Sequence, residues 1–165
     1  MNSPSDLLHS RILELLPKLR RFARSLTRNP HDADDLLQGA LESALAHLEQ
    51  WQTDTRLDSW LYTIVKHAWI DELRSRARRE RTFDHQGQAE AVADHRGDAS
   101  GTLAVEQAMA CLPAEQRLAV ALVLIEGLPY KEAAQIIGVP MGTLTSRLAR
   151  GRQALQQLLG PGESA

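Results

Sequence analysis

The chain has 165 residues, of which 43% are hydrophobic and 4% aromatic, and a formal net charge of -2. This length and apolar content suit one domain or two small ones and exclude a wholly disordered chain. The longest uninterrupted apolar run, 118–125, is much shorter than the about 20 residues that a membrane helix needs. The first ten residues lack the pattern of a signal peptide, so we expect a cytoplasmic protein with no membrane insertion.

Charge alternates in blocks along the chain. Residues 11–28 are basic, residues 31–54 hold acids and no Lys or Arg, residues 56–81 are basic again, and residues 82–102 are acidic. Such blocks indicate more than one charged surface for partners, although solvated helix faces show the same pattern.

Hydrophobic residues recur at three- and four-residue steps along most of the chain, which predicts an all-α fold. The first stripe covers 15–26 and contains Pro17, which either begins or kinks a helix. Asn29 followed by Pro30 is typical of an N-cap and a first helical residue. A second helical stripe then runs over 37–48.

A polar loop at 52–56 precedes a third stripe, which begins at Leu57 and ends near Arg81 in an arginine-rich segment. Within it, Trp60 and Leu61 lie on the apolar stripe and are expected in the core. From 82 to 102 the periodicity is lost, glycines recur and acids dominate, as in a flexible linker. We therefore expect two small helical domains, with the boundaries 1–81, 82–102 for the linker, 103–160, and 161–165 for a tail.

The second domain holds the most informative motif. After a helix that ends before Pro113 and another over 114–126, a short helix and a longer one are separated by 138–140. Small residues at Ala133 and Ala134 allow two helices to cross closely, and Gly138 suits a tight turn with positive φ. This pattern is typical of a helix-turn-helix.

The second helix of this motif turns Leu144 and Leu148 inward and a polar face outward. That face and the helix N-terminus supply side chains that suit base edges or phosphates. The candidate DNA-contacting residues are Met141, Gly142, Thr143, Thr145, Ser146, Arg147 and Arg150. An ordinary helical hairpin with a basic face is the alternative interpretation.

Catalysis is not expected. The six histidines show no metal-ligand spacing, and no glycine-rich phosphate loop is present. Cys111, the single cysteine, is expected to be a small core residue. The sequence thus predicts no metal, no cofactor and no small-molecule substrate.

Two separate motif blocks resemble one family. Residues 112–155, LPAEQRLAVALVLIEGLPYKEAAQIIGVPMGTLTSRLARGRQAL, look like the C-terminal domain of the extracytoplasmic-function (ECF) sigma factors of bacterial RNA polymerase. LRRFARSLTRNPHDADDLLQGAL and LDSWLYTIVKHAWIDELRSRARR are similar to the N-terminal domain of that family, in the same order and spacing. The resemblance implies a transcription initiation factor whose partners are core RNA polymerase, promoter DNA and an anti-sigma factor.

The resemblance also implies three binding surfaces. The acidic helix would bind the polymerase clamp through Asp34, Asp35, Gln38, Leu41 and Leu45. The minus-10 element would be read by the loop at 52–56, which would receive a flipped-out base, and by the next helix. Its candidate residues are Gln52, Thr53, Arg56, Lys66, His67, Trp69, Arg74 and Arg78. The helix-turn-helix would read the minus-35 element.

Two positions depart from the family pattern. Gly39 stands where a glutamate is usual, and a mid-helix glycine costs about 1 kcal/mol, so the polymerase contact or the helix should be weaker. His67 stands where an asparagine is common, which predicts a different DNA preference. The arginines from Arg74 to Arg81 are equally compatible with a solvated helix end.

Two other functions fit parts of the sequence. A sigma-like decoy would sequester an anti-sigma factor without binding DNA, and Gly39 favours it. A stand-alone helix-turn-helix regulator would bind operator DNA, but it leaves the first domain unexplained. Retention of Arg147 and Arg150 favours a sigma factor over the decoy.

Overall fold

The computed structural model describes residues 3–82 and 100–160. Within these ranges the chain is helical and contains no strand, which confirms the all-α prediction. The predicted tail at 161–165 and most of the predicted linker lie outside the described residues.

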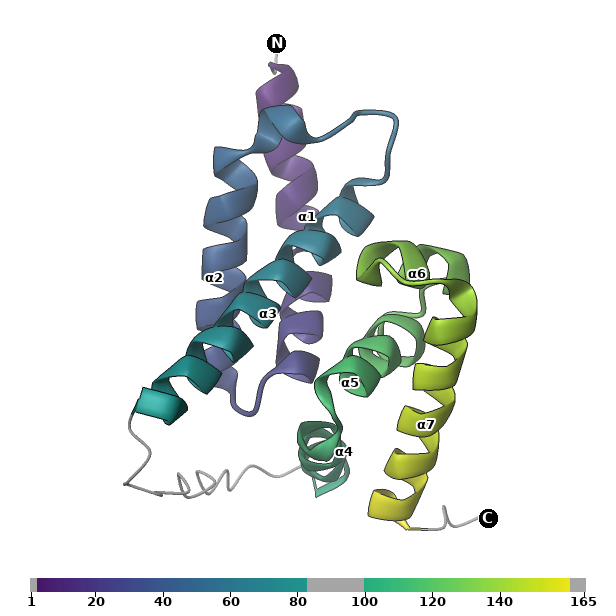
Figure 1. Cartoon of the computed structure of the whole chain (residues 1–165). Coiled ribbons are helices and arrows are strands. Elements are labelled where there is room, and N and C mark those ends of the chain that lie inside the picture. Colours follow the sequence, from purple (N-terminus) through teal and green to yellow (C-terminus); the bar gives the residue numbers. More distant parts are fainter. Residues whose placement is uncertain (1–2, 83–99, 161–165) are drawn as a thin grey trace.

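The N-terminal region consists of α1 (Pro4–Leu26), α2 (Pro30–Ala46), the short 3-10 turn η1 (Leu48–Gln50) and α3 (Leu57–Thr82). The Asn29 cap is confirmed, because its side-chain oxygen accepts a 2.8 Å hydrogen bond from the Asp32 backbone N–H. Figure 1 shows the three long helices side by side, with the loop after η1 at one end of the molecule.

Helix α1 is longer than its sequence stripe indicated. It begins at a capping box in which the Ser3 hydroxyl accepts from the Asp6 N–H and the Asp6 carboxylate accepts from the Ser3 N–H. This reciprocal cap satisfies two backbone donors and stabilises a helix start ahead of the apolar stripe. Pro17 lies inside α1 rather than at its start.

The C-terminal region consists of α4 (Ser100–Cys111), α5 (Ala114–Val120), a π-helical turn η2 (Ala121–Ile125), α6 (Tyr130–Ile137) and α7 (Met141–Leu159). Helix α4 begins at Ser100, inside the predicted linker. Cys111 is exposed at the end of α4, so its expected place in the core is wrong.

The two regions pack against each other and share one continuous hydrophobic core. Helix α1 contacts α4, α5 and η2, and α3 contacts α6. Phe22 and Tyr62, with ring centroids 5.1 Å apart in an edge-to-face pair, are buried in this core. In Figure 1 α6 lies beside the upper, N-terminal part of α3, and α4 and α5 lie beside the lower part of α1.

The C-terminal region depends on a close helix crossing. Helix α5 packs along α7, and Gly151 on α7 is buried there. A Cβ added at Gly151 would lie 2.7 Å from the Val120 Cγ2 atom, so the crossing distance requires glycine. This contact fixes the position of α7, the second helix of the predicted helix-turn-helix.

Candidate polymerase and nucleic-acid interfaces

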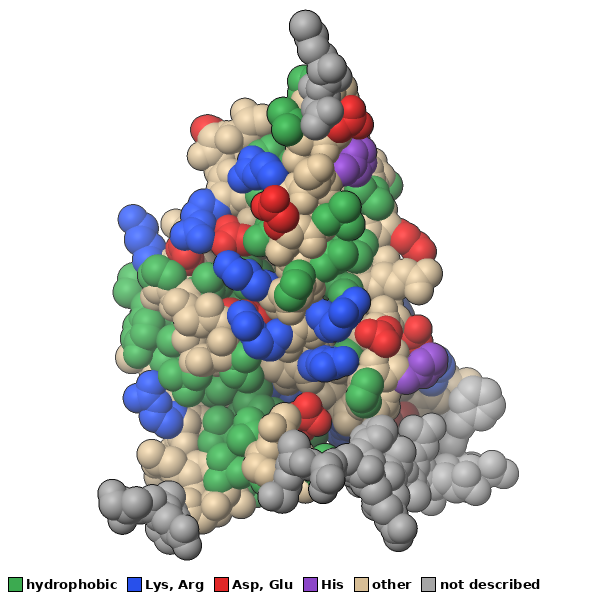
Figure 2. Space-filling view, turned by 180° about the vertical axis from the view of Figure 1, so that it is seen from behind, with side chains coloured by type: hydrophobic (Ala, Val, Ile, Leu, Met, Phe, Trp, Pro, Cys, Tyr) green, Lys and Arg blue, Asp and Glu red, His purple; other side chains and the backbone are tan. Residues whose placement is uncertain are grey.

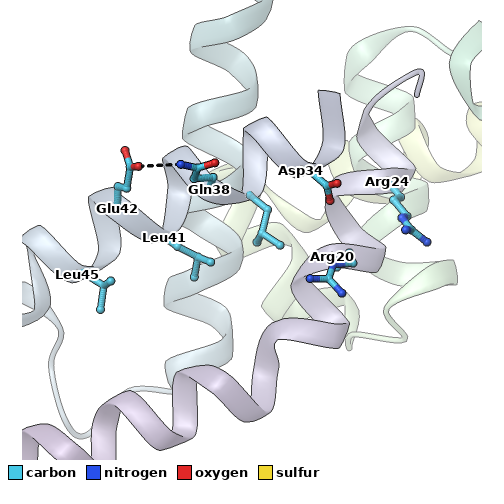
Figure 3. A pocket seen from close by; sticks show the side chains of 8 residues that line it. Arg20, Arg24, Asp34, Gln38, Leu41, Glu42 and Leu45 are labelled. Atoms are coloured by element: carbon cyan, nitrogen blue, oxygen red, sulfur yellow. Dashed lines mark hydrogen bonds between the residues drawn. The ribbon is translucent and has the colours of Figure 1, made fainter. Parts of the chain in front are cut away.

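A groove between α1 and α2 collects four of the five residues predicted to bind polymerase. It is lined by Arg20, Arg24, Asp34, Leu37, Gln38, Leu41, Glu42 and Leu45. Figure 3 shows Leu41 and Leu45 on one stretch of α2, the Gln38 amide hydrogen-bonded to Glu42, and Asp34 near the two arginines of α1. The groove thus has an apolar end, at Leu41 and Leu45, and a charged end, at Asp34 and the two arginines.

Asp35 does not lie in this groove. It faces the other side of α2, where its carboxylate is 3.5 Å from the imidazole of His31 and lines a separate hollow shared with α3. Adjacent helical positions point about 100° apart, which separates it from Asp34. Sequence reasoning missed Arg20, Arg24 and Glu42, although α1 carries a run of exposed bases that could have indicated the first two.

The α6–α7 pair has the helix-turn-helix geometry. Gly138 ends α6 with φ of +80°, as predicted for the tight turn, and Ala133 and Ala134 are buried at the crossing. On α7, Leu144 and Leu148 are buried. The predicted DNA-contacting residues Met141, Gly142, Thr145, Ser146 and Arg150 are exposed, and Thr143 is half-buried.

Arg147 is more constrained than the sequence indicated. Its guanidinium lies 3.4 Å from the Glu115 carboxylate of α5, and its side chain is 22% exposed. Arg147 therefore has a structural partner within the C-terminal region, in addition to the DNA contact proposed for it. Arg150, one turn further along α7, is exposed.

Of the residues predicted to read the minus-10 element, most are exposed. Gln52 and Thr53 lie in the loop before α3, and His67, Arg74 and Arg78 are exposed on α3. Partial desolvation and the neighbouring Lys66 charge lower the pKa of His67.

Two of these residues are not on an exposed face. Trp69 is 4% exposed and belongs to the core of the N-terminal region, so its expected position along an open DNA path is wrong. Lys66 is 7% exposed, and its ammonium donates a 2.8 Å hydrogen bond to the Ile136 carbonyl of α6. Burial lowers the pKa of Lys66. The burial of Lys66 depends on packing between the regions, which the periodicity of α3 does not encode, whereas Trp69 lies on the apolar stripe four residues after Val65.

Arg56, at the end of the predicted base-reading loop, connects three elements. Its guanidinium pairs with Asp58 at 2.8 Å and with Glu132 of α6 at 2.9 Å. Hydrogen bonding to Asp58 and the two carboxylate charges raise the pKa of Arg56. Nearby, the guanidinium of Arg11 lies over the ring of Trp51, 5.7 Å from its centroid, which ties α1 to the start of this loop.

Basic side chains also gather on the face opposite to that of Figure 1. Figure 2 shows Lys and Arg side chains across the middle of this face, with hydrophobic side chains below them. Helix α1 carries the exposed basic residues Lys18, Arg20, Arg21 and Arg24. Among residues 3–82 and 100–160, no three His, Cys, Asp or Glu side chains are grouped to hold a metal ion. No helix in the described parts of the chain is long and apolar enough to span a membrane.

The two regions match two parts of a single protein family. Residues 12–79 match the model of Sigma-70 region 2, and residues 102–155 match that of Sigma-70, region 4. The fold and its surfaces therefore define a sigma-70-type transcription factor.

Curated relatives and a solved structure narrow the class. The chain is 39% identical over 143 residues to the ECF RNA polymerase sigma factor SigM of Mycobacterium tuberculosis, covering 87% of this chain and 72% of the relative. It is 36% identical over 158 residues to the ECF RNA polymerase sigma factor EcfG of Rhodopseudomonas palustris, covering 94% and 86%. A sigma factor RpoE from Bartonella quintana, solved with the anti-sigma factor NepR, superposes with a TM-score of 0.84 at 33% identity, covering 94% and 98%.

The chain belongs to the ECF RNA polymerase sigma factors. As such, it directs core RNA polymerase to specific promoters for transcription initiation.

Proposed function

We propose that this sigma factor uses three surfaces in initiation, with no catalysis of its own. The α1–α2 groove binds core polymerase, the loop at 52–56 with α3 reads the minus-10 element, and the N-terminal half of α7 reads the minus-35 element. In this proposal a unit at 1–81 binds core polymerase and minus-10 DNA, a unit at 103–160 binds minus-35 DNA, and 82–102 connects them.

The observation that best supports the proposal is the helix-turn-helix geometry. The positive φ of Gly138 sets the angle between α6 and α7, and burial of Leu144 and Leu148 leaves Thr145, Ser146 and Arg150 exposed. A helix presented in this way suits the major groove.

Minus-35 reading is tested with a matched pair of arginines on α7. Arg150→Ala should weaken holoenzyme binding to its minus-35 element by about 1–3 kcal/mol if the side chain reads a base, with relaxed specificity at one position. Arg152→Ala is the control, because Arg152 is exposed on a different face of α7. Equal losses for both variants on all sequences would make Arg150 only a non-specific phosphate contact.

Arg147 is tested with its partner. Arg147→Ala should lower affinity on the cognate element by about 1–3 kcal/mol. Glu115→Ala removes the ion pair and leaves Arg147 in place. If both variants lose the same affinity, Arg147 acts through the structure of the C-terminal region rather than through DNA.

The polymerase groove is tested with two exposed leucines. Leu45 is 47% exposed and lines the groove, whereas Leu13 is 63% exposed on α1 and does not. Leu45→Asp should reduce binding to core polymerase, and Leu13→Asp should not. If both variants bind core polymerase as well as the wild type does, the polymerase contact lies elsewhere.

Control by an anti-sigma factor is proposed from the relative of known structure, which was solved in complex with one. Affinity capture of the tagged chain under repressing conditions should recover a small protein in addition to polymerase subunits. Binding to core polymerase without initiation at any promoter would instead favour the decoy.

A further inference from the structure

Three contacts between the two regions share one chemical direction, and a fourth, from Arg117 to the Leu26 carbonyl, runs the other way. Three basic side chains of the N-terminal region each donate to an acceptor on the C-terminal region: Arg56 to Glu132, Lys66 to the Ile136 carbonyl, and Arg21 to Glu126. The C-terminal region thus offers carboxylates and a carbonyl to cationic side chains, as a phosphate backbone would.

The Lys66 contact is the most enclosed of the three. The ammonium is 2.8 Å from the last-turn carbonyl of α6, and the residue is 7% exposed. The C-terminal end of a helix carries a partial negative charge, so this acceptor suits a cation. While the contact holds, Lys66 is not accessible to DNA.

The other two contacts bracket it. Arg56 pairs with Glu132 at the start of α6, and the Arg21 Nε atom is 3.0 Å from Glu126, whose side chain is fully buried. The π-helical turn η2 packs on α1 directly before Glu126, which places this carboxylate beside Arg21. The contacts thus extend from α1 to both ends of α6.

We propose that the described packing is an autoinhibited state, in which α6 covers Lys66 and pairs with Arg56 and must move away before the minus-10 element is read. This inference rests on the proposed function, since it takes Arg56 and Lys66 to be DNA contacts. The C-terminal region then has two roles. It reads promoter DNA in the open state, and in the closed state it competes with DNA for the side chains of Arg56 and Lys66.

Lysine reactivity can be used to detect this state, because the chain has only three lysines. Lys66 is buried in the contact, whereas Lys18 and Lys131 are exposed. Acetylation of the full chain by an N-hydroxysuccinimide ester, followed by mass spectrometry, measures all three rates in one sample. In the free protein, Lys66 should react about tenfold more slowly than the other two, because reaction requires opening. Equal rates at the three lysines would overturn the proposal.

Glu132→Gln weakens the Arg56–Glu132 contact between the regions, and Glu132 is not among the residues proposed to bind DNA or polymerase. The matched control is Glu115→Gln, which makes the same charge change in an ion pair internal to the C-terminal region. Glu132→Gln should raise the Lys66 rate about threefold, the effect of one partly exposed ion pair, and Glu115→Gln should not. Identical Lys66 rates in the two variants would count against the proposal.

Competition with DNA is measured by fluorescence anisotropy on a single-stranded oligonucleotide of the minus-10 strand. Glu132→Gln should bind about threefold more tightly than Glu115→Gln, in line with the opening measured by acetylation. A faster Lys66 rate with unchanged DNA affinity would show a contact that does not inhibit, and would refute the proposal.

Promoter-dependent transcription by Lys66→Gln with core polymerase separates a failure of the proposed function from a failure of the autoinhibition proposal. If this variant initiates as well as the wild type, the DNA role of Lys66 is wrong. If it is impaired while Glu132→Gln behaves like Glu115→Gln, the DNA role stands and only the autoinhibition fails.

Discussion

The two regions achieve stability in different ways. The N-terminal region uses long helices, side-chain caps at Ser3 and Asn29, and large aromatic residues in its core. The C-terminal region uses helices that start after Pro113, Pro129 and Pro140 without a side-chain cap, and its helices cross over small residues. The first region should therefore be sensitive to removed volume, and the second to added volume.

The largest effect is expected in the aromatic core of the N-terminal region. Phe22 is fully buried against Tyr62, so Phe22→Ala should lower the free energy of unfolding by about 3–5 kcal/mol. Urea denaturation measures this. Leu13→Ala, at an exposed position on the same helix, should change it by no more than about 0.5 kcal/mol.

The C-terminal region should respond to a single added methyl group. Gly151→Ala places a Cβ 2.7 Å from the Val120 side chain and should cost about 1–3 kcal/mol. In a double-mutant cycle with Val120→Ala, the combined loss should be smaller than the sum of the two single losses, because the second change makes room. Additive losses in thermal unfolding would contradict steric crowding at this crossing.

The turn of the helix-turn-helix tests backbone conformation rather than volume. Gly138 has φ of +80°, and no atom lies within 4 Å of the place that a Cβ would take, so Gly138→Ala should cost about 1–2 kcal/mol through backbone strain alone. Gly138→Asn should cost less, since asparagine tolerates this conformation better. Equal losses for the two variants would argue against strain as the cause.

The smallest effect is expected at Gly39, where the change is stabilising. No atom lies within 4 Å of an added Cβ, and the position is in the middle of α2, so Gly39→Ala should gain about 1 kcal/mol. Gly39→Glu restores the carboxylate usual in the family, and its affinity for core polymerase should exceed that of Gly39→Ala. Equal affinities would assign the effect of this glycine to helix stability.

Much of the fold followed from local patterns. The helical stripes, the Asn29 cap and the Gly138 turn depend on neighbours within a few residues, and each was predicted correctly. The burial of Lys66, the exposure of Cys111 and the place of Asp35 outside the groove depend on which helix faces which, so periodicity alone did not reveal them. Trp69 is different, because it lies four residues after Val65 on the apolar stripe and its burial could have been predicted. The roles of the site residues remain predictions.

Arg117 has a consequence for how the two regions separate. Its Nε atom donates to the Met109 carbonyl near the end of α4 and its Nη1 atom to the Leu26 carbonyl at the end of α1, while its buried Nη2 atom has no partner among the described residues. Burial lowers the pKa of Arg117 to about 10, which reflects hydration that the guanidinium has lost. If the two regions separate as proposed, water can replace the Leu26 carbonyl as the acceptor for Nη1. The junction is therefore held by a cation that gains hydration on release, which favours a reversible joint over a permanent one.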